Sequence, residues 1–124
     1  FNSQRYAHDP GEIPIAQRDQ PSPFTRSGLS VGGAIKPELV AYGGNWAVNL
    51  RTVNAWIVRQ GLGELSTCRD FAAGRLFDED SGTSFAAPHV AHLAARILLE
   101  QPDADHNLLR AILVAHARWP AAIE

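Results

Sequence analysis

Apolar side chains recur at helical spacing in two stretches in the second half of the chain. The first runs from about Ser84 to Glu100, and the second from about Ala104 or His106 to Ala117. The recurring residues are Val90, Leu93, Ala94, Ile97 and Leu98 in the first stretch, and Leu108, Leu109, Ile112, Leu113 and Ala115 in the second. Because intervals of three and four residues put these side chains on one side, the pattern predicts two amphipathic helices.

Breakers and caps mark the ends of both helices. Gln101-Pro102 ends the first helix, because proline cannot continue it, and Asp103 or Asp105 is the expected N-cap of the second. Trp119-Pro120 ends the second helix. We expect Pro88 to lie in the first turn of the first helix, where backbone N–H groups have no partner within the helix and proline is tolerated.

The remainder of the chain holds short apolar runs between turn residues, a pattern typical of strands. Short strands are expected at Ile13–Ala16, Glu38–Tyr42, Ala55–Arg59, Glu64–Thr67 and Arg75–Phe77. We expect the strand at Glu38–Tyr42 to be buried, and Phe71-Ala72-Ala73 to form a turn of helix. Closely spaced prolines in residues 1–22 favour an extended arm there.

The composition narrows the class of protein. A chain of 124 residues with 45% hydrophobic and 19% charged residues suits one small globular domain or part of a larger one. A net charge of −2 gives no reason to expect nucleic acid or an anionic membrane as a partner, and no apolar run approaches the roughly 20 residues of a membrane span. The chain begins at Phe1 and lacks Met, so we expect a fragment, and neither a cytoplasmic nor a secreted location is indicated.

One serine stands at a position suited to chemistry. Ser84 follows Gly82-Thr83 in a turn directly before the first predicted helix. The N–H groups of a first helical turn lack partners, and the local dipole is positive. A hydroxyl there can attack a carbonyl while nearby N–H groups stabilise the oxyanion. The alternative is that Ser84 only serves as the N-cap of the helix.

The ten residues Gly82–Ala91 resemble the nucleophile motif of the subtilases, the subtilisin-like serine peptidases. Three further segments resemble the family in the family's order: Phe24–Gly28, Ile35–Gly43 and Leu65–Thr67. The resemblance implies an α/β fold, namely the C-terminal portion of a three-layer α/β/α domain with short strands followed by two helices. Residues 23–124 would form this segment, and residues 1–22 an extended arm or a family insertion.

The same resemblance implies a serine endopeptidase that hydrolyses polypeptide substrates through an acyl-enzyme. The family's triad follows the order Asp, His, Ser, and Ser84 takes the place of the nucleophile. Gly82 and Thr83 would shape the turn, and Pro88 would orient the start of the helix. The family's Asp and His motifs and its oxyanion Asn have no counterpart in this chain. We therefore expect the upstream part of the same protein to supply the triad His and Asp, and the isolated fragment to be inactive and able to form a homodimer.

Departures from the family pattern keep a second function open. Tyr42 stands where proline is usual, and His92 where glycine is common. Together with the unmatched residues 1–22, these support a non-catalytic subtilase-like module for binding or assembly. Substrate preference is not readable here, because most of the family's specificity pocket comes from upstream segments.

Other residues capable of chemistry have simpler interpretations, and we expect no cofactor. His89 and His92 could ligate zinc, but no third ligand lies at a suitable spacing, so a polar stripe facing solvent or the parent domain is favoured. Asp78-Glu79-Asp80 could hold the calcium that many subtilases bind, but it lacks the alternating ligand pattern and favours a solvated surface turn.

The single cysteine and the three tryptophans also have alternative interpretations. The lone Cys68 excludes an intrachain disulfide framework and is either a reactive thiol or a passive, partly buried residue. Trp46, Trp56 and Trp119 could contact a substrate, but the default for tryptophan is a buried anchor.

Overall fold

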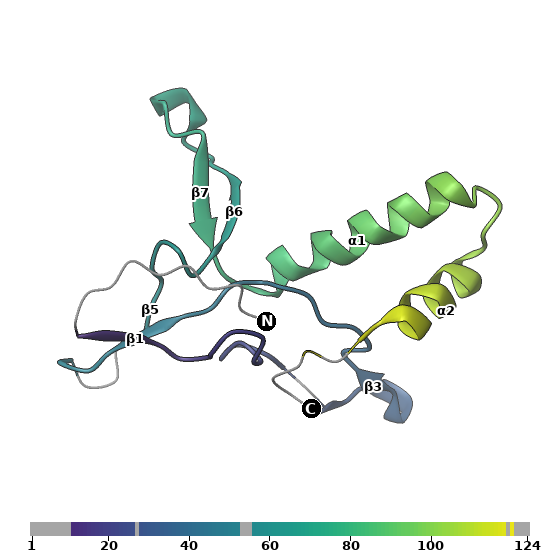
Figure 1. Ribbon diagram of the computed structural model, residues 1–124, viewed down its shortest axis with the longest axis horizontal. Helices are drawn as coiled ribbons and strands as arrows, with labels where there is room; N and C mark the ends of the chain where they lie inside the picture. Colours follow the sequence, from purple (N-terminus) through teal and green to yellow (C-terminus); the bar gives the residue numbers. More distant parts are fainter. Residues whose placement is uncertain (1–10, 27, 53–55, 119, 121–124) are drawn as a thin grey trace.

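The computed structural model describes residues 11–26, 28–52, 56–118 and 120, which form small sheets and two helices (Figure 1). The strands are β1 (Glu12–Pro14), β2 (Gly28–Leu29), β3 (Ile35–Lys36), β4 (Ala47–Asn49), β5 (Trp56–Ile57), β6 (Glu64–Thr67) and β7 (Phe77–Asp80). Short 3-10 turns lie at Val31–Gly33 and Phe71–Ala73, and the helices are α1 (Thr83–Glu100) and α2 (His106–His116). The architecture is α+β and is compatible with a piece of an α/β domain.

The strands among the described residues form three separate antiparallel sheets. In the first sheet β4 lies between β1 and β5, with Val48 opposite both Ile13 and Trp56. β2 pairs with β3, and β6 pairs with β7 in a hairpin that sets Leu65 opposite Glu79. This hairpin and the α1–α2 pair project from the rest of the chain in different directions (Figure 1).

The core is small, and only part of it lies beside β1 and β4, because Cys68 lies between β6 and β7 in the hairpin. Among the described residues, the buried hydrophobic side chains are those of Ala16, Ala47, Leu62 and Cys68. Glu12 in β1 is only 2% exposed, and the Arg59 Nε donates a hydrogen bond to its Oε2 at 2.7 Å. This pairing offsets the cost of burying the carboxylate. Residues 12–14 pair with β4, so this part of residues 1–22 belongs to the first sheet. The division of the chain at residue 22 stays a prediction.

Two of the strand predictions are wrong. Glu38–Tyr42 is irregular, with Val40 and Tyr42 exposed, because no described strand lies beside it to pair with its backbone. The strand expected at Arg75–Phe77 instead spans Phe77–Asp80. Acidic residues are poor strand formers in general, but here they pair along β6.

The other strand predictions hold with adjusted ends. Glu64–Thr67 and the helical turn at Phe71–Ala73 are confirmed. The strand expected at Ile13–Ala16 is β1, which ends at Pro14. That expected at Ala55–Arg59 is β5, of which Trp56–Ile57 lies within the described residues, whereas position 55 lies outside them.

Both predicted helices are confirmed. α1 begins at Thr83, and α2 begins at His106. The Asp105 carboxylate accepts a hydrogen bond from the Leu108 N–H at 2.8 Å, so Asp105 is the N-cap rather than Asp103. None of the helices in the described part of the chain is long and apolar enough to cross a membrane.

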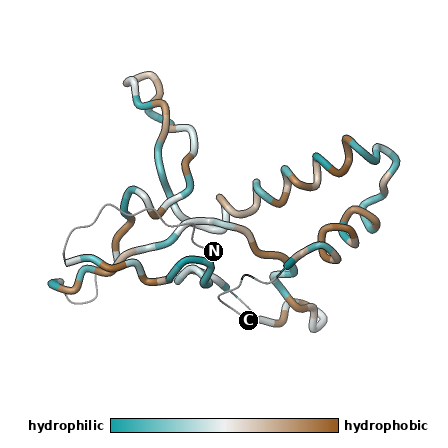
Figure 2. The backbone as a smooth tube through the Cα atoms, in the orientation of Figure 1, coloured by the Kyte–Doolittle hydropathy of each residue, from teal (hydrophilic) through white to brown (hydrophobic). Residues whose placement is uncertain are grey.

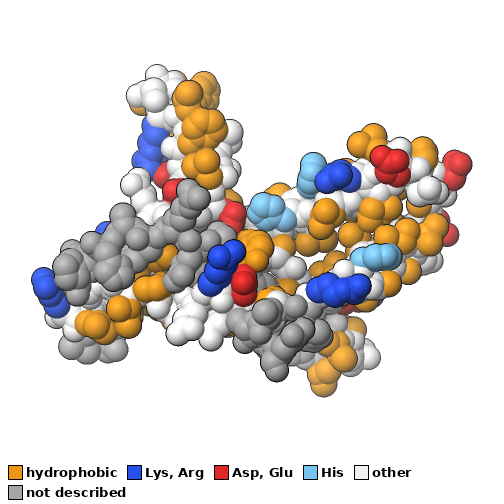
Figure 3. All heavy atoms as spheres, in the orientation of Figure 1, with side chains coloured by type: hydrophobic (Ala, Val, Ile, Leu, Met, Phe, Trp, Pro, Cys, Tyr) orange, Lys and Arg blue, Asp and Glu red, His pale blue; other side chains and the backbone are white. Residues whose placement is uncertain are grey.

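Hydrophobic residues recur along both α1 and α2 (Figure 2). Side chains of this kind line an open groove between the two helices (Figure 3). The groove has a volume of about 960 Å³, and Leu39, Val90, Ile97 and Leu113 contribute to its apolar lining. No described residue of either helix is buried. The described residues of this chain therefore provide no layer that covers the apolar faces of the helices.

A polar tie joins α2 to the segment that follows β3. Glu38 accepts a hydrogen bond from Arg110 of α2 and forms an ion pair with Lys36, whose Nζ lies 3.0 Å from the Glu38 Oε1. The hydrogen bonds from Lys36 and Arg110 hold the pKa of Glu38 below its usual value of 4.5. This tie fixes one side of the groove.

Candidate functional site

Ser84 is the second residue of α1 and projects an exposed hydroxyl. The helix follows directly from β7 through Ser81 and Gly82. Gly82 is the N-cap, in an extended conformation with φ 163° and ψ 166°, and no side chain caps the helix. The interpretation of Ser84 as an N-cap is therefore wrong. Among the described residues the Ser84 hydroxyl has no hydrogen-bond partner, so it is available for another role.

The N–H groups beside the hydroxyl are also available. The first residues of a helix have no acceptor one turn earlier, and this applies to Thr83 and Ser84. The Phe85 N–H is the next in line and donates to the Gly82 carbonyl at 3.0 Å. The Ser84 N–H therefore sits beside the hydroxyl at the positive end of the helix dipole, where an oxyanion would be stabilised.

Pro88 does not lie in the first helical turn, so that expectation is wrong. α1 begins at Thr83, which places Pro88 in the second turn. A residue at this position would normally donate its N–H to the carbonyl of Ser84, four residues earlier. Proline has no N–H, so the Ser84 carbonyl lacks its helical hydrogen bond. The residues that lead into α1, Ser81 and Gly82, form hydrogen bonds with another part of the chain.

One backbone segment, residues 43–45, supplies those contacts. The Gly82 N–H donates to the Gly43 carbonyl at 2.7 Å, and the Ser81 hydroxyl donates to the Asn45 carbonyl at 3.0 Å. A side chain at position 43 would place its Cβ 2.7 Å from the Gly82 oxygen, so the close approach requires glycine. Gly44 adopts a φ of +84°, and a Cβ there would meet the Ser81 Oγ at 2.3 Å.

Sequence reasoning did not identify Asn45 as part of this junction. The side chain is completely buried and bonds to the backbone of Ala16. The available signal was the Gly43-Gly44 pair directly before a polar residue, which is typical of a close backbone approach. The bonding partners lie 29 residues away, and no local pattern reveals them.

His89 contacts a carboxylate of the neighbouring hairpin. Its Nε2 lies 3.5 Å from the Glu64 Oε2, and the other Glu64 oxygen is buried without a hydrogen-bond partner in the described part of the chain. His92 is exposed. Among residues 11–26, 28–52, 56–118 and 120, no group of three or more His, Cys, Asp or Glu side chains is arranged to hold a metal ion.

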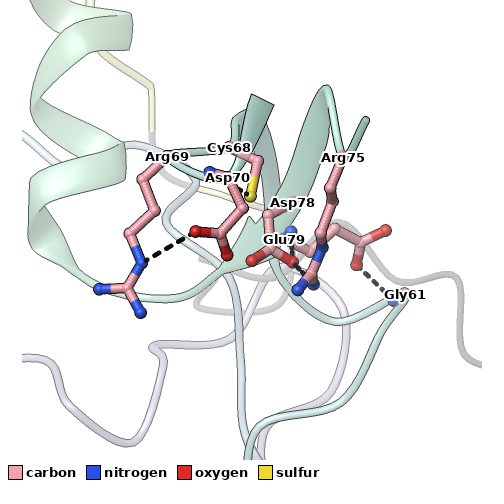
Figure 4. A network of polar contacts seen from close by, with 7 residues as sticks. All are labelled: Gly61, Cys68, Arg69, Asp70, Arg75, Asp78 and Glu79. Carbon is pink, nitrogen blue, oxygen red and sulfur yellow. Dashed lines mark hydrogen bonds and ion pairs between the residues drawn. The ribbon is translucent and has the colours of Figure 1, made fainter. Parts of the chain in front are cut away.

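The acidic run lies in a strand, so the expected surface turn is wrong. Asp78, Glu79 and Asp80 form most of β7. Figure 4 shows contacts of the first two: Asp78 accepts a hydrogen bond from Arg75, and Glu79 accepts one from the Gly61 N–H. These carboxylates bind protein groups of the hairpin and the preceding loop. Calcium binding at this run stays an expectation from the resemblance.

The cysteine and tryptophan predictions have mixed outcomes. Cys68 is buried, and its Sγ accepts a hydrogen bond from the Asp70 N–H at 3.4 Å, in line with a passive residue (Figure 4). Trp46 is half-buried and stacks on Trp56 with ring centroids 4.4 Å apart. Trp56 is 61% exposed, so the buried-anchor prediction is wrong for it. Trp119 lies outside the described residues.

Tyr42, the residue that stands where the subtilase pattern has proline, bonds to the N-terminal segment. Its hydroxyl donates to the Asp19 Oδ1 at 2.8 Å. This hydrogen bond, together with partial burial, raises the pKa of Tyr42 above its usual value of 10.0. The substitution thus adds a polar contact one residue before Gly43.

Comparison with known proteins agrees with the pattern of motifs. The profile of the subtilase family matches residues 5–122 of this chain. A protein of Sinorhizobium fredii (strain NBRC 101917 / NGR234), described as the uncharacterized protein y4bN, is 38% identical over 109 residues. The aligned part covers 86% of this chain and 25% of that relative, so the chain spans about a quarter of the relative's length. No solved structure matches the chain at a significant level. The match over nearly all of its length shows that the chain belongs to the subtilase family.

Proposed function

We propose that this chain carries the nucleophile of a serine endopeptidase and that the nucleophile is Ser84. The observation that carries the proposal is the exposed Ser84 hydroxyl in the first turn of α1, next to N–H groups without helical partners. Membership of the subtilase family supports a peptidase. Gly82 and Thr83 shape the turn. Pro88 has no N–H, so it leaves the Ser84 carbonyl without the helical hydrogen bond that this carbonyl would otherwise accept.

The proposed reaction proceeds through an acyl-enzyme. A histidine base removes the Ser84 proton as the Ser84 oxygen attacks the peptide carbonyl, and the Ser84 N–H stabilises the resulting oxyanion. The histidine then gives the proton to the leaving amine as the peptide bond breaks. A water molecule, deprotonated by the same base, hydrolyses the ester and releases the acid product.

The base and the acid that orients it come from outside this chain in our proposal. His89 lies on α1 itself and contacts Glu64, while the His116 Nδ1 contacts the Ile112 carbonyl oxygen at the far end of α2. Losing the histidine alone lowers turnover about 10⁶-fold in subtilisin. The isolated chain is therefore expected to be inactive.

The missing layer of the fold is proposed to come from the same upstream part. α1 and α2 would pack their apolar faces on a central sheet, giving the C-terminal portion of a three-layer α/β/α domain. The open groove and the absence of buried side chains in both helices support this arrangement. The substrate is a polypeptide, and upstream segments select its sequence.

A pair of variants in the full-length protein tests the proposal. Ser84→Ala removes the nucleophile, so hydrolysis of a quenched fluorescent peptide mixture is expected to fall by about 10⁶-fold. Ser66→Ala is the matched control, because Ser66 is an exposed serine of β6 outside the proposed site. Equal hydrolysis by Ser84→Ala and the wild type would refute Ser84 as the nucleophile.

The second candidate function is a subtilase-like module for binding or assembly without turnover. The uncovered apolar faces of α1 and α2 favour it, since they offer an interface for another protein or a second copy of the chain. The two functions differ in what they require of Ser84. Full biological function of Ser84→Ala would favour the module, whereas its loss would favour the peptidase.

A further inference from the structure

We infer that Asn45 is a positioning residue for Ser84. Its buried carboxamide fixes the loop against which the start of α1 rests. The inference rests on the proposed function, because it assigns to Asn45 the task of orienting a nucleophile that Asn45 itself does not touch.

Asn45 joins the N-terminal segment to the rest of the fold. Its Nδ2 donates to the Ala16 carbonyl at 2.8 Å, and its Oδ1 accepts from the Ala16 N–H at 3.3 Å. The side chain thus forms a two-bond pairing with one residue, as a neighbouring strand would. Asn45 is 0% exposed, so these bonds are shielded from competing water.

The backbone of Asn45 contacts the two segments that flank the hairpin. Its N–H donates to the Leu62 carbonyl at 2.8 Å, in the loop before β6. Its carbonyl accepts the Ser81 hydroxyl at 3.0 Å, directly after β7. One buried residue therefore links the N-terminal segment, the base of the hairpin and the approach to α1.

The direct hydrogen bonds between the loop at Asn45 and the residues that precede Ser84 make this link relevant to chemistry. Gly43, two residues before Asn45, accepts the Gly82 N–H at 2.7 Å. Ser81 and Gly82 precede α1 directly, so both bonds hold the residues that lead into the helix. A shift of the Asn45 loop would move both acceptors together, and Ser84 would move with them.

An apolar side chain of the same size could fill the space, but it could not set the orientation of the loop. Two hydrogen bonds to Ala16 specify one rotamer and one register of residue 45. Loss of the carboxamide is therefore expected to affect the placement of the Ser84 hydroxyl more than the binding of substrate. Misplacement of a catalytic group by about 1 Å is enough to lower the rate about 10²-fold.

The test compares variants of the full-length protein with the active sites titrated by a fluorophosphonate. Asn45→Ala removes the carboxamide, and Asn49→Ala, in β4 and only half-buried, is the matched control. We expect kcat per titrated site to fall about 10²-fold in Asn45→Ala with KM nearly unchanged, and both to stay within about twofold of the wild type in Asn49→Ala.

Ser81→Ala provides a milder second variant, in case Asn45→Ala does not fold. It removes one hydroxyl hydrogen bond, so kcat is expected to fall by about two- to tenfold. When both variants fold, the double variant is expected to lose less than the product of the single losses, because both act through one junction.

Each result decides a different claim. A kcat per titrated site that stays at the wild-type value in Asn45→Ala, or in Ser81→Ala when Asn45→Ala does not fold, would overturn the positioning role and leave the proposed peptidase intact. A loss that appears only as fewer titratable sites would also overturn it, because Asn45 would then serve folding alone. A wild-type protein without titratable sites would overturn the proposed function together with this inference.

Discussion

At the scale of single residues, the site depends on groups that the helix leaves unbonded. The Ser84 hydroxyl has no partner among the described residues, and the Ser84 N–H lies in the first turn, where no helical acceptor exists. Pro88 extends this pattern, because it also leaves the Ser84 carbonyl without its helical donor. Ser84 is therefore held by the backbone around it rather than by its own side chain.

Tyr42 gives a pH-dependent prediction at this scale. Its hydrogen bond to Asp19 raises the folded-state pKa above 10.0, so its contribution to stability is present in full below that pH and is lost as the pH rises through the folded-state pKa. We expect Tyr42→Phe to lower the thermal unfolding temperature near neutral pH and to differ less from the wild type well above pH 10. An equal difference at both pH values would contradict this linkage.

At the scale of elements, the start of α1 is set by its contact with an irregular segment. Gly43 and Gly82 approach each other closely, and the Gly82 N–H donates a hydrogen bond to the Gly43 carbonyl at 2.7 Å. The hairpin β6–β7 then leads the chain into α1, and His89 contacts Glu64 at the hairpin's base. The position of Ser84 thus depends on how these elements meet.

Two glycines at this contact are predicted to respond differently to alanine. At position 43 a Cβ would lie 2.7 Å from the Gly82 oxygen, so Gly43→Ala is expected to lower the thermal unfolding temperature of the full-length protein. At position 82 a Cβ would lie 3.9 Å from its nearest neighbour, and the extended φ suits any residue. Gly82→Ala should therefore unfold near the wild-type temperature, and equal losses for both variants would refute the close-approach argument.

The N-cap of α2 offers a second prediction for an element. Asp105→Ala removes the carboxylate that accepts the Leu108 N–H, and is expected to cost about 1 kcal/mol of stability. Asp103→Ala is the matched control, because Asp103 is exposed and does not cap α2. Denaturant titration measures both, and a loss in Asp103→Ala that equals the loss in Asp105→Ala would contradict the assignment.

The elements that the sequence predicted well are those whose signals are local. α1 and α2 follow from apolar spacing and from the residues at their ends, and both lie within a few residues of their predicted bounds. Glu38–Tyr42 failed because a strand needs a partner, and an apolar run does not show whether one is present. The role of Ser84 was predicted from its motif and stays a prediction, whereas the contacts of Asn45 could not be predicted, because its partner Ala16 is remote in sequence.

At the scale of the whole molecule, the chain is open and has little interior. The buried hydrophobic side chains among the described residues are few, and neither helix has a buried residue, so apolar side chains of both lie at the surface (Figure 3). The hairpin likewise exposes Leu65, Phe71 and Phe77. Monomeric soluble proteins rarely expose so much contiguous apolar surface. This openness suits a piece that packs against other parts of a longer protein.

The openness predicts how residues 1–124 behave when produced alone. We expect the isolated chain to self-associate and to bind a dye specific for apolar surfaces, because no described residue covers the groove between α1 and α2. Sedimentation over a range of concentrations measures the association. A stable monomer without dye binding would show that the faces are covered in some other way.

The central claim is that Ser84 becomes a nucleophile when the rest of the protein supplies its base. The most direct measurement is to treat both the full-length protein and the isolated chain with a fluorophosphonate, and to locate the adduct by peptide mass spectrometry. We predict one adduct on Ser84 of the full-length protein and none on the isolated chain. An adduct on another residue of the folded full-length protein, or no adduct at all, would contradict the account.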